Sequence, residues 1–390
     1  MDKTRPTGNA YTLWGGALSL YTGKVRSYLI KTGIPYREYY TCHPEYRERV
    51  FRTVQLGVAP ILESPDGDTV QDTTDIIEYL ERKHPATSMI PRTPVQRAVA
   101  WLICAFGSDG LLPAAMHYRW SYKDEQRLWL LDEFGRFSSS GTRAERHEAA
   151  GKFMARMDAM LPALGVTRES APAIEASHRA MLAILDEHFL AHPYLLGGRP
   201  SIADFGMMAA MFAHLGRDPV PAHLMKLTAP NVYRWTERMN LAGIFDPEFP
   251  DTPDAWLADD AIPKTLLPLL AHIFGDWGPE LLASAAHYNE WVRVHPDLPA
   301  GTPPSLVTGR RVVHPMLGKV SYPYRGITME RHCAANSLWH FEKSAAIART
   351  FEGNVRACWQ ALLAETGGAE MMAIRLARPM KRENYLLVLA

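Results

Sequence analysis

The sequence has few cysteines. Four occur in 390 residues, and none forms a CxxC pair. This scarcity argues against a disulfide-bonded scaffold and fits free thiols in a reducing compartment. His332, Cys333 and His340 lie close in sequence, but their spacing is not that of a metal site. We therefore expect a cytoplasmic protein with no bound metal.

Long apolar runs and an excess of charge of one sign are also absent. No run approaches the roughly 18 apolar residues that a membrane span needs, and residues 1–14 contain no apolar region of a signal peptide. The 42 basic residues balance the 42 acidic ones, so neither nucleic acid nor a membrane is expected as a partner. The chain is long enough for two or three domains.

The first ninety residues carry strand and helix patterns in turn. Short β-prone runs occur at 11–14, 35–42 and 58–64, and a fourth, TVQD, follows the turn residues PDGD. Apolar residues with helical spacing follow the first run and stop at Gly33, and a second such pattern covers 73–84. The expected order is β-α-β followed by β-β-α.

This order, with a proline at the start of the third strand, resembles the N-terminal domain of glutathione transferases. The motifs that carry the resemblance are SLYTGKVR, VAPIL, DGDTVQDTTDIIEYL and PYLLGGRPSIADF, which lie between residues 11 and 240. The resemblance implies an α/β thioredoxin-like domain, an all-α domain and glutathione as the cosubstrate. We expect these domains at 1–88 and 89–245, with a mostly helical C-terminal extension at 246–390.

Ser19 is the predicted catalytic residue. In the serine and cysteine members of the family that this chain resembles, the active group lies six residues before a valine-like position, which is Val25 here. The tyrosine members place their hydroxyl earlier, where this chain has Gly15. The resemblance therefore implies that Ser19 stabilises the thiolate of glutathione. Helix capping is the alternative role for Ser19, and Tyr21 is the reserve candidate.

Four further residues would bind glutathione. The resemblance implies a cis peptide bond before Pro60 and a main-chain contact between Ala59 and the cysteinyl part of glutathione. Asp72 and Thr73 occupy the place of the family's acidic-then-serine pair, which holds the γ-glutamyl end. Asp72 would pair with the α-ammonium, and Thr73 would bind the carboxylate at a helix N-terminus. The sequence DTTD also has the spacing of a capping box, and both roles can coexist.

One segment of the helical half is apolar nearly all round. This segment, 201–215, is expected to form a central, buried helix with its methionines in the core. Ser201 and Asp204 at its start resemble the family's buried N-capping box, which is a folding element. We therefore keep both residues out of the predicted active site.

The family pattern ends near residue 245. Residues 244–300 carry a net charge of −8 and residues 301–390 carry +6. This split predicts that the two halves face each other or the rest of the protein. The extension could cover the substrate cleft, build a dimer or bind a partner. Helical patterns occur at 264–274, 278–293 and 337–365, and YLLVLA ends the chain as a strand.

The predicted function is that of a glutathione-dependent transferase. Its thiolate would attack a small hydrophobic electrophile, and ether cleavage or isomerisation would use the same thiolate step. The resemblance implies a homodimer and a second substrate against 110–129, where we favour a structural role for His117 and Arg119 themselves. The alternative is a non-catalytic protein-interaction module. A disulfide reductase is a weaker third hypothesis, because Ser19 stands where that chemistry needs a cysteine.

Overall fold

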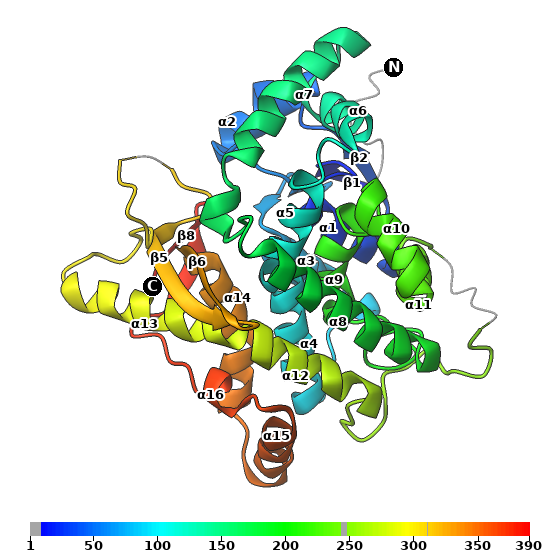
Figure 1. Ribbon diagram of the computed structural model, residues 1–390, viewed down its shortest axis with the longest axis vertical. Helices are drawn as coiled ribbons and strands as arrows, with labels where there is room; N and C mark the ends of the chain where they lie inside the picture. Colours follow the sequence, from blue (N-terminus) through cyan, green and yellow to red (C-terminus); the bar gives the residue numbers. More distant parts are fainter. Residues whose placement is uncertain (1–8, 243–247, 310) are drawn as a thin grey trace.

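The computed structural model describes residues 9–242, 248–309 and 311–390. A mixed sheet comes first, with the strands in the order β2-β1-β3-β4 (Figure 1). The first two strands in sequence pair in parallel, and the other pairs are antiparallel. This sheet and its helices form the predicted thioredoxin-like domain. Its elements are β1 (Tyr11–Trp14), α1 (Leu20–Thr32), β2 (Tyr36–Tyr39), α2 (Phe51–Val54), β3 (Ile61–Glu63), β4 (Thr69–Gln71) and α3 (Thr73–Lys83).

Both faces of this sheet are covered. Successive side chains of a strand point to opposite faces, so Leu13 and Trp14 of β1 belong to different cores. Leu13 is fully buried in the main core, which includes apolar residues of α1 and α3. Trp14 packs on the other face against Ile61 of β3 and Val54 of α2. Each face of the sheet thus has its own apolar core.

The helices that follow form the predicted all-α domain, and α9 lies at its centre. Met207, Met208 and Met211 of α9 are fully buried, which confirms their predicted place in the core. A Cβ on Gly107 would lie 2.5 Å from the backbone of Gly206 in α9, so glycine at both positions lets the backbones touch. The helices are α4 (Pro94–Ala105), α5 (Leu112–Trp120), α6 (Arg127–Ser138), α7 (Arg143–Asp158), α8 (Ala171–Ala191), α9 (Ile202–Ala213), α10 (Pro219–Thr228) and α11 (Pro230–Met239).

The predicted capping box at the start of α9 is present. The Asp204 carboxylate accepts hydrogen bonds from the Ser201 backbone N–H at 2.9 Å and from its hydroxyl at 3.1 Å. It also accepts from the Leu195 N–H at 3.0 Å and from the Trp235 indole N–H at 3.1 Å. Asp204 therefore joins three segments of the domain, which confirms that it is a folding element.

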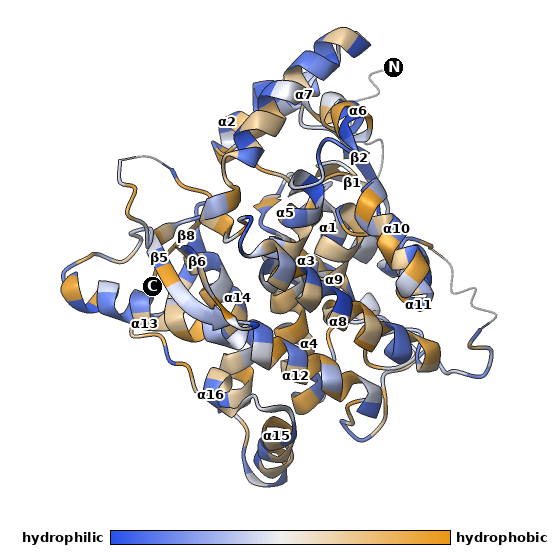
Figure 2. Cartoon of the chain, in the orientation of Figure 1, coloured by the Kyte–Doolittle hydropathy of each residue, from blue (hydrophilic) through white to orange (hydrophobic). Residues whose placement is uncertain are grey.

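Contrary to the expectation that no apolar run approaches the length of a membrane span, the helical run Pro94–Trp120 is long and apolar enough to cross a membrane, with a mean hydropathy of 1.5 over its most apolar window. It consists of α4, a π-helical turn and α5. In this structure 89% of that window is buried inside the protein. The run is therefore a core helix of the all-α domain. By contrast, α7 at the edge of the molecule carries many hydrophilic residues (Figure 2).

The extension packs against both preceding domains. Its helix α14 lies along α4, where the Ser344 hydroxyl donates to the Ala98 carbonyl at 2.8 Å. Lys343 of α14 also pairs with Glu78 of α3 at 2.8 Å. The predicted domain boundary at 245/246 lies outside the described residues. The elements of the extension are α12 (Leu267–Asp276), α13 (Gly278–Val294), β5 (Met316–Tyr324), β6 (Ile327–Ala334), α14 (Ala335–Arg349), α15 (Gly353–Thr366), α16 (Ala369–Met372), β7 (Met380–Glu383) and β8 (Leu386–Leu389).

The helices predicted at 264–274 and 278–293 and the last strand are present, but the helical pattern at 337–365 is divided into α14 and α15. The helix α16, the strand β7 and the β5–β6 hairpin were not predicted. The two strands alternate between buried and exposed side chains around a turn at Gly326, which has a φ of 84°. This alternation was readable in the sequence. Pro323 inside β5 and the Gly318 irregularity weaken it, because neither residue is favoured within a strand.

The opposite charges of the two halves of the extension do face each other. Arg331 of β6 pairs with Glu280 of α13 at 2.8 Å, and both side chains are buried. Arg325 pairs with Asp276 of α12 at 2.6 Å. The acidic first half and the basic second half are therefore joined by ion pairs, as their net charges predicted.

Candidate active site

Three strand ends meet at one edge of the thioredoxin-like sheet. Trp14 at the end of β1 is paired with Ile61 at the start of β3, and Ile61 is paired with Gln71 at the end of β4. The loops that leave these positions therefore begin beside one another. They carry all the predicted site residues, which are Ser19, Ala59, Pro60, Asp72 and Thr73.

Ser19 is the N-cap of α1. Its backbone is extended, with φ −81° and ψ 121°, and its hydroxyl oxygen accepts a hydrogen bond from the Thr22 backbone N–H at 3.3 Å. The capping role is therefore real. Capping uses a lone pair of the oxygen, so the hydroxyl hydrogen remains available to donate to a ligand. Ser19 is half-buried, and it lies where the N–H groups of α1 favour an anion.

Tyr21, the reserve candidate, lies in the first turn of α1. Its side chain is partly exposed. Burial, together with the nearby carboxylates of Asp109 and Asp72, raises the pKa of Tyr21 well above its usual range. The phenol therefore keeps its proton at neutral pH and can act only as a neutral hydrogen-bond donor or acceptor.

The peptide bond between Ala59 and Pro60 is cis, as the resemblance implied. Pro60 is buried directly before β3, and Ala59 is partly exposed. The carbonyl of the preceding residue, Val58, accepts a hydrogen bond from the Tyr46 hydroxyl at 2.8 Å. Tyr46 thereby fixes this loop from the face of the sheet that α2 covers.

Asp72 caps α3 with a positive φ of 78° and a ψ of 136°. Its carboxylate accepts a hydrogen bond from the Thr74 backbone N–H at 2.9 Å. Thr73 follows as the first residue of α3 and is only 3% exposed. The spacing of DTTD predicted a capping box in which Asp75 would be the second partner. The Asp75 carboxylate instead lies 3.5 Å from a nitrogen of Arg382 in the extension.

Two cations of the extension lie against Asp72. A guanidinium nitrogen of Arg382, on β7, is 3.3 Å from the carboxylate, and Nε2 of His340, on α14, is 3.7 Å from it. The same Arg382 nitrogen donates to the side-chain oxygen of Gln71 at 2.7 Å. Nδ1 of His340 lies 2.5 Å from the carboxylate of Asp109. The extension thus covers the end of the site that carries Asp72.

These contacts shift the ionisation of the groups involved. Burial alone would raise the pKa of Asp72, but Arg382 and His340 outweigh it and hold the pKa well below its usual range. Burial and the Asp72 charge raise the pKa of Asp75 to about 7. Burial would lower the pKa of His340, but Asp109 and Asp72 raise it to about 9. At neutral pH, Asp72 is therefore an anion held between two cations.

Sequence reasoning missed Asp109, His340 and Arg382 as neighbours of the site. His340 is 231 residues from Asp109, and Arg382 is 311 residues from Gln71. A local pattern in the chain does not encode contacts at such separations. The net positive charge of the last ninety residues was the one related signal, and it did not point to a particular arginine.

Arg119, in the stretch 110–129, holds the loop before Ser19 in place. The guanidinium of Arg119 binds both carboxylate oxygens of Asp218, at 2.6 and 3.0 Å. It also donates to the carbonyl of Leu18, directly before Ser19, at 2.9 Å. His117 lies 3.0 Å from the Glu175 carboxylate. These contacts fit the structural role that we favoured for Arg119 and His117. The expected place of a second substrate against 110–129 stays a prediction.

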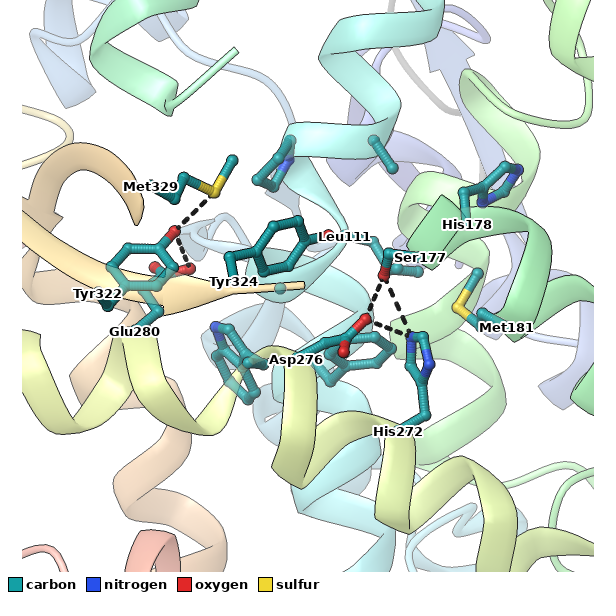
Figure 3. A pocket seen from close by; sticks show the side chains of 15 residues that line it. Leu111, Ser177, His178, Met181, His272, Asp276, Glu280, Tyr322, Tyr324 and Met329 are labelled. Carbon is teal, nitrogen blue, oxygen red and sulfur yellow. Dashed lines mark hydrogen bonds and ion pairs between the residues drawn. The ribbon is translucent and has the colours of Figure 1, made fainter. Parts of the chain in front are cut away.

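A second polar cluster lies between α8 and α12 (Figure 3). Ser177, His272 and Asp276 gather there, but their order is not that of a hydrolase triad. The Ser177 hydroxyl donates directly to Asp276 at 2.5 Å and is 3.5 Å from His272 Nε2, while His272 Nδ1 faces Arg325 at 3.3 Å. The cavity beside the cluster has room for about one water molecule. The cluster therefore joins the extension to the all-α domain.

Two domain families match this chain. The glutathione S-transferase N-terminal domain matches residues 13–88, and the glutathione S-transferase C-terminal domain matches residues 152–241. The chain therefore carries both domains of the glutathione S-transferase family and belongs to it as a glutathione-transferase-like enzyme. No curated protein matches the chain significantly.

Several solved structures are similar to part of the chain. A glutathione S-transferase from Rhodospirillum rubrum is 16% identical, with a TM-score of 0.37, and the match covers 65% of this chain and 96% of that one. The β-etherase LigF from Sphingobium is 18% identical, with a TM-score of 0.39 and coverage of 61% and 96%. The transferase GSTFuA3 from Phanerochaete chrysosporium is 14% identical, with a TM-score of 0.41 and coverage of 61% and 98%. The family assignment rests on the two matched domains and not on these scores.

Proposed function

We propose that the protein is a glutathione-dependent transferase in which Ser19 activates the glutathione thiol. The observation that carries this proposal is the meeting of three strand ends at one edge of the sheet. A hydroxyl at a helix N-terminus, the strand entered through Ala59 and Pro60, and the capped start of α3 all lie at that edge. Each would supply one of the contacts that the family resemblance implies.

The energy that this mechanism needs is small. A free thiol has a pKa near 8.5, and each unit by which it is lowered requires about 1.4 kcal/mol of preference for the thiolate. A hydrogen bond from the Ser19 hydroxyl and the positive end of α1 together supply an interaction of that order. Ser19 donates to sulfur and does not itself attack the substrate. The thiolate carries out the attack on a small hydrophobic electrophile.

The glutamyl end of glutathione would bind at the start of α3. Asp72 is ionised and can pair with the α-ammonium, while Thr73 and the first N–H groups of the helix can bind the α-carboxylate. Ala59 would contact the cysteinyl main chain. Transfer, ether cleavage and isomerisation all begin with the same thiolate, so they are alternative outcomes at one site.

We also propose that the protein is cytoplasmic and forms a homodimer. All four cysteines are free, which is consistent with the reducing cytoplasm. A homodimer is the assembly that the family resemblance implies. Sedimentation of the full-length protein at several concentrations tests the dimer directly, and a monomer at every concentration would exclude it.

Calorimetric titration with glutathione tests the proposed function. Wild-type protein should bind glutathione saturably, and Thr73→Ala should weaken that binding. Ser19→Ala should lose both the thiolate and the helix cap, with about 1 kcal/mol of stability. Ser19→Asp is the matched control, because aspartate also caps a helix but its negative charge repels a thiolate. We expect Ser19→Asp to keep the stability and lose the thiolate, which ultraviolet absorbance of the bound thiol measures. Thiolate formation that survives in both variants would leave Ser19 with only its capping role.

A non-catalytic interaction module is the second candidate, and one observation favours it. Arg382 and His340 already neutralise Asp72, so the γ-glutamyl subsite is occupied by the chain itself. Under this alternative, no binding would be seen at millimolar glutathione, and no electrophile would be consumed with glutathione in excess.

A further inference from the structure

The β7–β8 hairpin contacts the proposed glutathione site at two separate places. The first is the Asp72 end, where Arg382 of β7 reaches the side chains of Gln71, Asp72 and Asp75. The Arg382 side chain is only 9% exposed, and its guanidinium also lies over the ring of Trp339. The guanidinium of Arg382 therefore contacts the Asp72 carboxylate. In the proposed function, this carboxylate binds the α-ammonium of glutathione.

The second place is the loop that carries Ala59 and Pro60. Tyr385 and Leu386, at the tip of the hairpin, pack against the apolar cluster that contains Trp14 and Val58. Arg311 links the same two regions, because one of its nitrogens donates to the carbonyls of both Val54 and Asn384. The hairpin thus spans from the γ-glutamyl subsite to the neighbourhood of the cysteinyl subsite.

The tip and the base of the hairpin are held by different kinds of contact. Each strand has only four residues, and an isolated two-stranded hairpin is marginally stable at best. The turn residues Asn384 and Tyr385 have φ values of 48° and 65°, a conformation that is unfavourable for tyrosine. The far end is better held, since the Leu389 N–H donates to the Thr302 carbonyl at 2.9 Å. The base of the hairpin is thus anchored by a main-chain hydrogen bond, whereas the tip is held by Arg311 and by the packing of Tyr385 and Leu386.

The ionic contacts at Asp72 are also of a kind that a ligand can replace. Arg382 Nε has no hydrogen-bond partner among the described residues, and the two carboxylates lie at 3.3 and 3.5 Å from the guanidinium. Buried ion pairs of this kind contribute little net stability, because desolvation offsets the attraction. An α-ammonium brought by a ligand could take the place of the guanidinium at similar free energy.

We propose that the β7–β8 hairpin is a built-in competitor of glutathione, with Arg382 occupying the place of the α-ammonium on Asp72. This inference rests on the proposed function. Glutathione then binds to the form in which the tip of the hairpin has withdrawn, and the closed hairpin lowers the apparent affinity. Closure and glutathione binding are mutually exclusive, so each shifts the population of the other.

Titration of the full-length protein with glutathione, comparing Arg382→Gln with Lys381→Gln, tests the proposal. Lys381 is the neighbouring residue on β7, and its side chain is 48% exposed and pairs with Glu383. Arg382→Gln should bind glutathione about five-fold or more tightly than the wild type. Lys381→Gln should bind like the wild type. Equal or weaker binding by Arg382→Gln, when the wild type binds, would overturn the competition and leave the proposed function intact.

Hydrogen exchange of the wild-type protein gives a second measurement that needs no variant. Saturating glutathione should speed the exchange of the backbone amides of 381–388 and leave those of α9 unchanged. Increased protection of 381–388 would show that the hairpin completes the bound site instead of competing with the ligand. If neither the wild type nor Arg382→Gln binds glutathione, the proposed function fails and the competition fails with it.

Discussion

Two buried arginines face aspartates in this molecule, and they differ in how completely they are bonded. Arg119 binds both oxygens of Asp218 and also donates to the carbonyls of Leu18 and Ala213, all between 2.6 and 3.0 Å. Arg382 makes a hydrogen bond to Gln71, but its carboxylate contacts with Asp72 are longer and its Nε has no hydrogen-bond partner in the described chain. The comparison separates a permanent structural link from a contact that can be exchanged for a ligand.

The positions of the two arginines in the fold agree with this difference in bonding. Arg119 lies inside the all-α domain and ties the loop before Ser19 to the segment that precedes α10. Arg382 lies on a hairpin near the end of the chain, at a surface where two parts of the molecule meet. A fully satisfied buried charge must stay in place, because its removal leaves its partner unpaired.

The largest expected effect is that of Arg119→Ala. Breaking this buried pair leaves the Asp218 carboxylate uncompensated, and we expect a loss of about 3–5 kcal/mol in the free energy of unfolding. Urea denaturation measures this loss. Arg293→Ala, at an exposed ion pair with Glu290, is the control and should change nothing measurable. A loss below about 1 kcal/mol for Arg119→Ala would remove the distinction between the two arginines.

The second expected effect is a pH dependence that comes from His340. Its folded-state pKa is raised from 6.5 to about 9, so its contribution to stability is fully present below pH 6.5 and is lost as the pH rises through 9. At about 1.4 kcal/mol per pKa unit, the fall is on the order of 3 kcal/mol. Unfolding free energies measured across this pH window should fall in the wild type and stay flatter in His340→Gln. An equal slope in both proteins would show that the charge of His340 does not hold the extension on Asp72 and Asp109.

The smallest expected effect on stability is that of Arg382→Gln. Glutamine can keep a hydrogen bond to Gln71, and Asp72 keeps His340 and the Thr74 N–H. Asp75, whose pKa is about 7, can take up a proton when the guanidinium is gone. We therefore expect a change within about 1 kcal/mol in urea denaturation, in contrast to Arg119→Ala. A loss as large as that of Arg119→Ala would make Arg382 a structural link and argue against a mobile hairpin tip.

The sequence by itself determined the order of strands and helices in the first domain, apart from α2, and the buried helix α9. The cap of α1 at Ser19, the box at Ser201 and Asp204, and the buried methionines of α9 all follow from residues within one or two helical turns. Such interactions are local, so the chain encodes them in short patterns. The family motifs then placed Pro60 and Asp72 at the ends of neighbouring strands, where the structure has them.

Only the tertiary structure decided what covers the site. The meeting of Asp72 with Arg382 and His340, and the support of the Ser19 loop by Arg119, join residues that are about a hundred to three hundred positions apart. The contacts of Asp72 depend on how the extension packs against α3 and α4, and a charge pattern shows the sign of a partner but not its identity. The physical reason is that packing of whole elements, and not local conformational preference, brings such groups together.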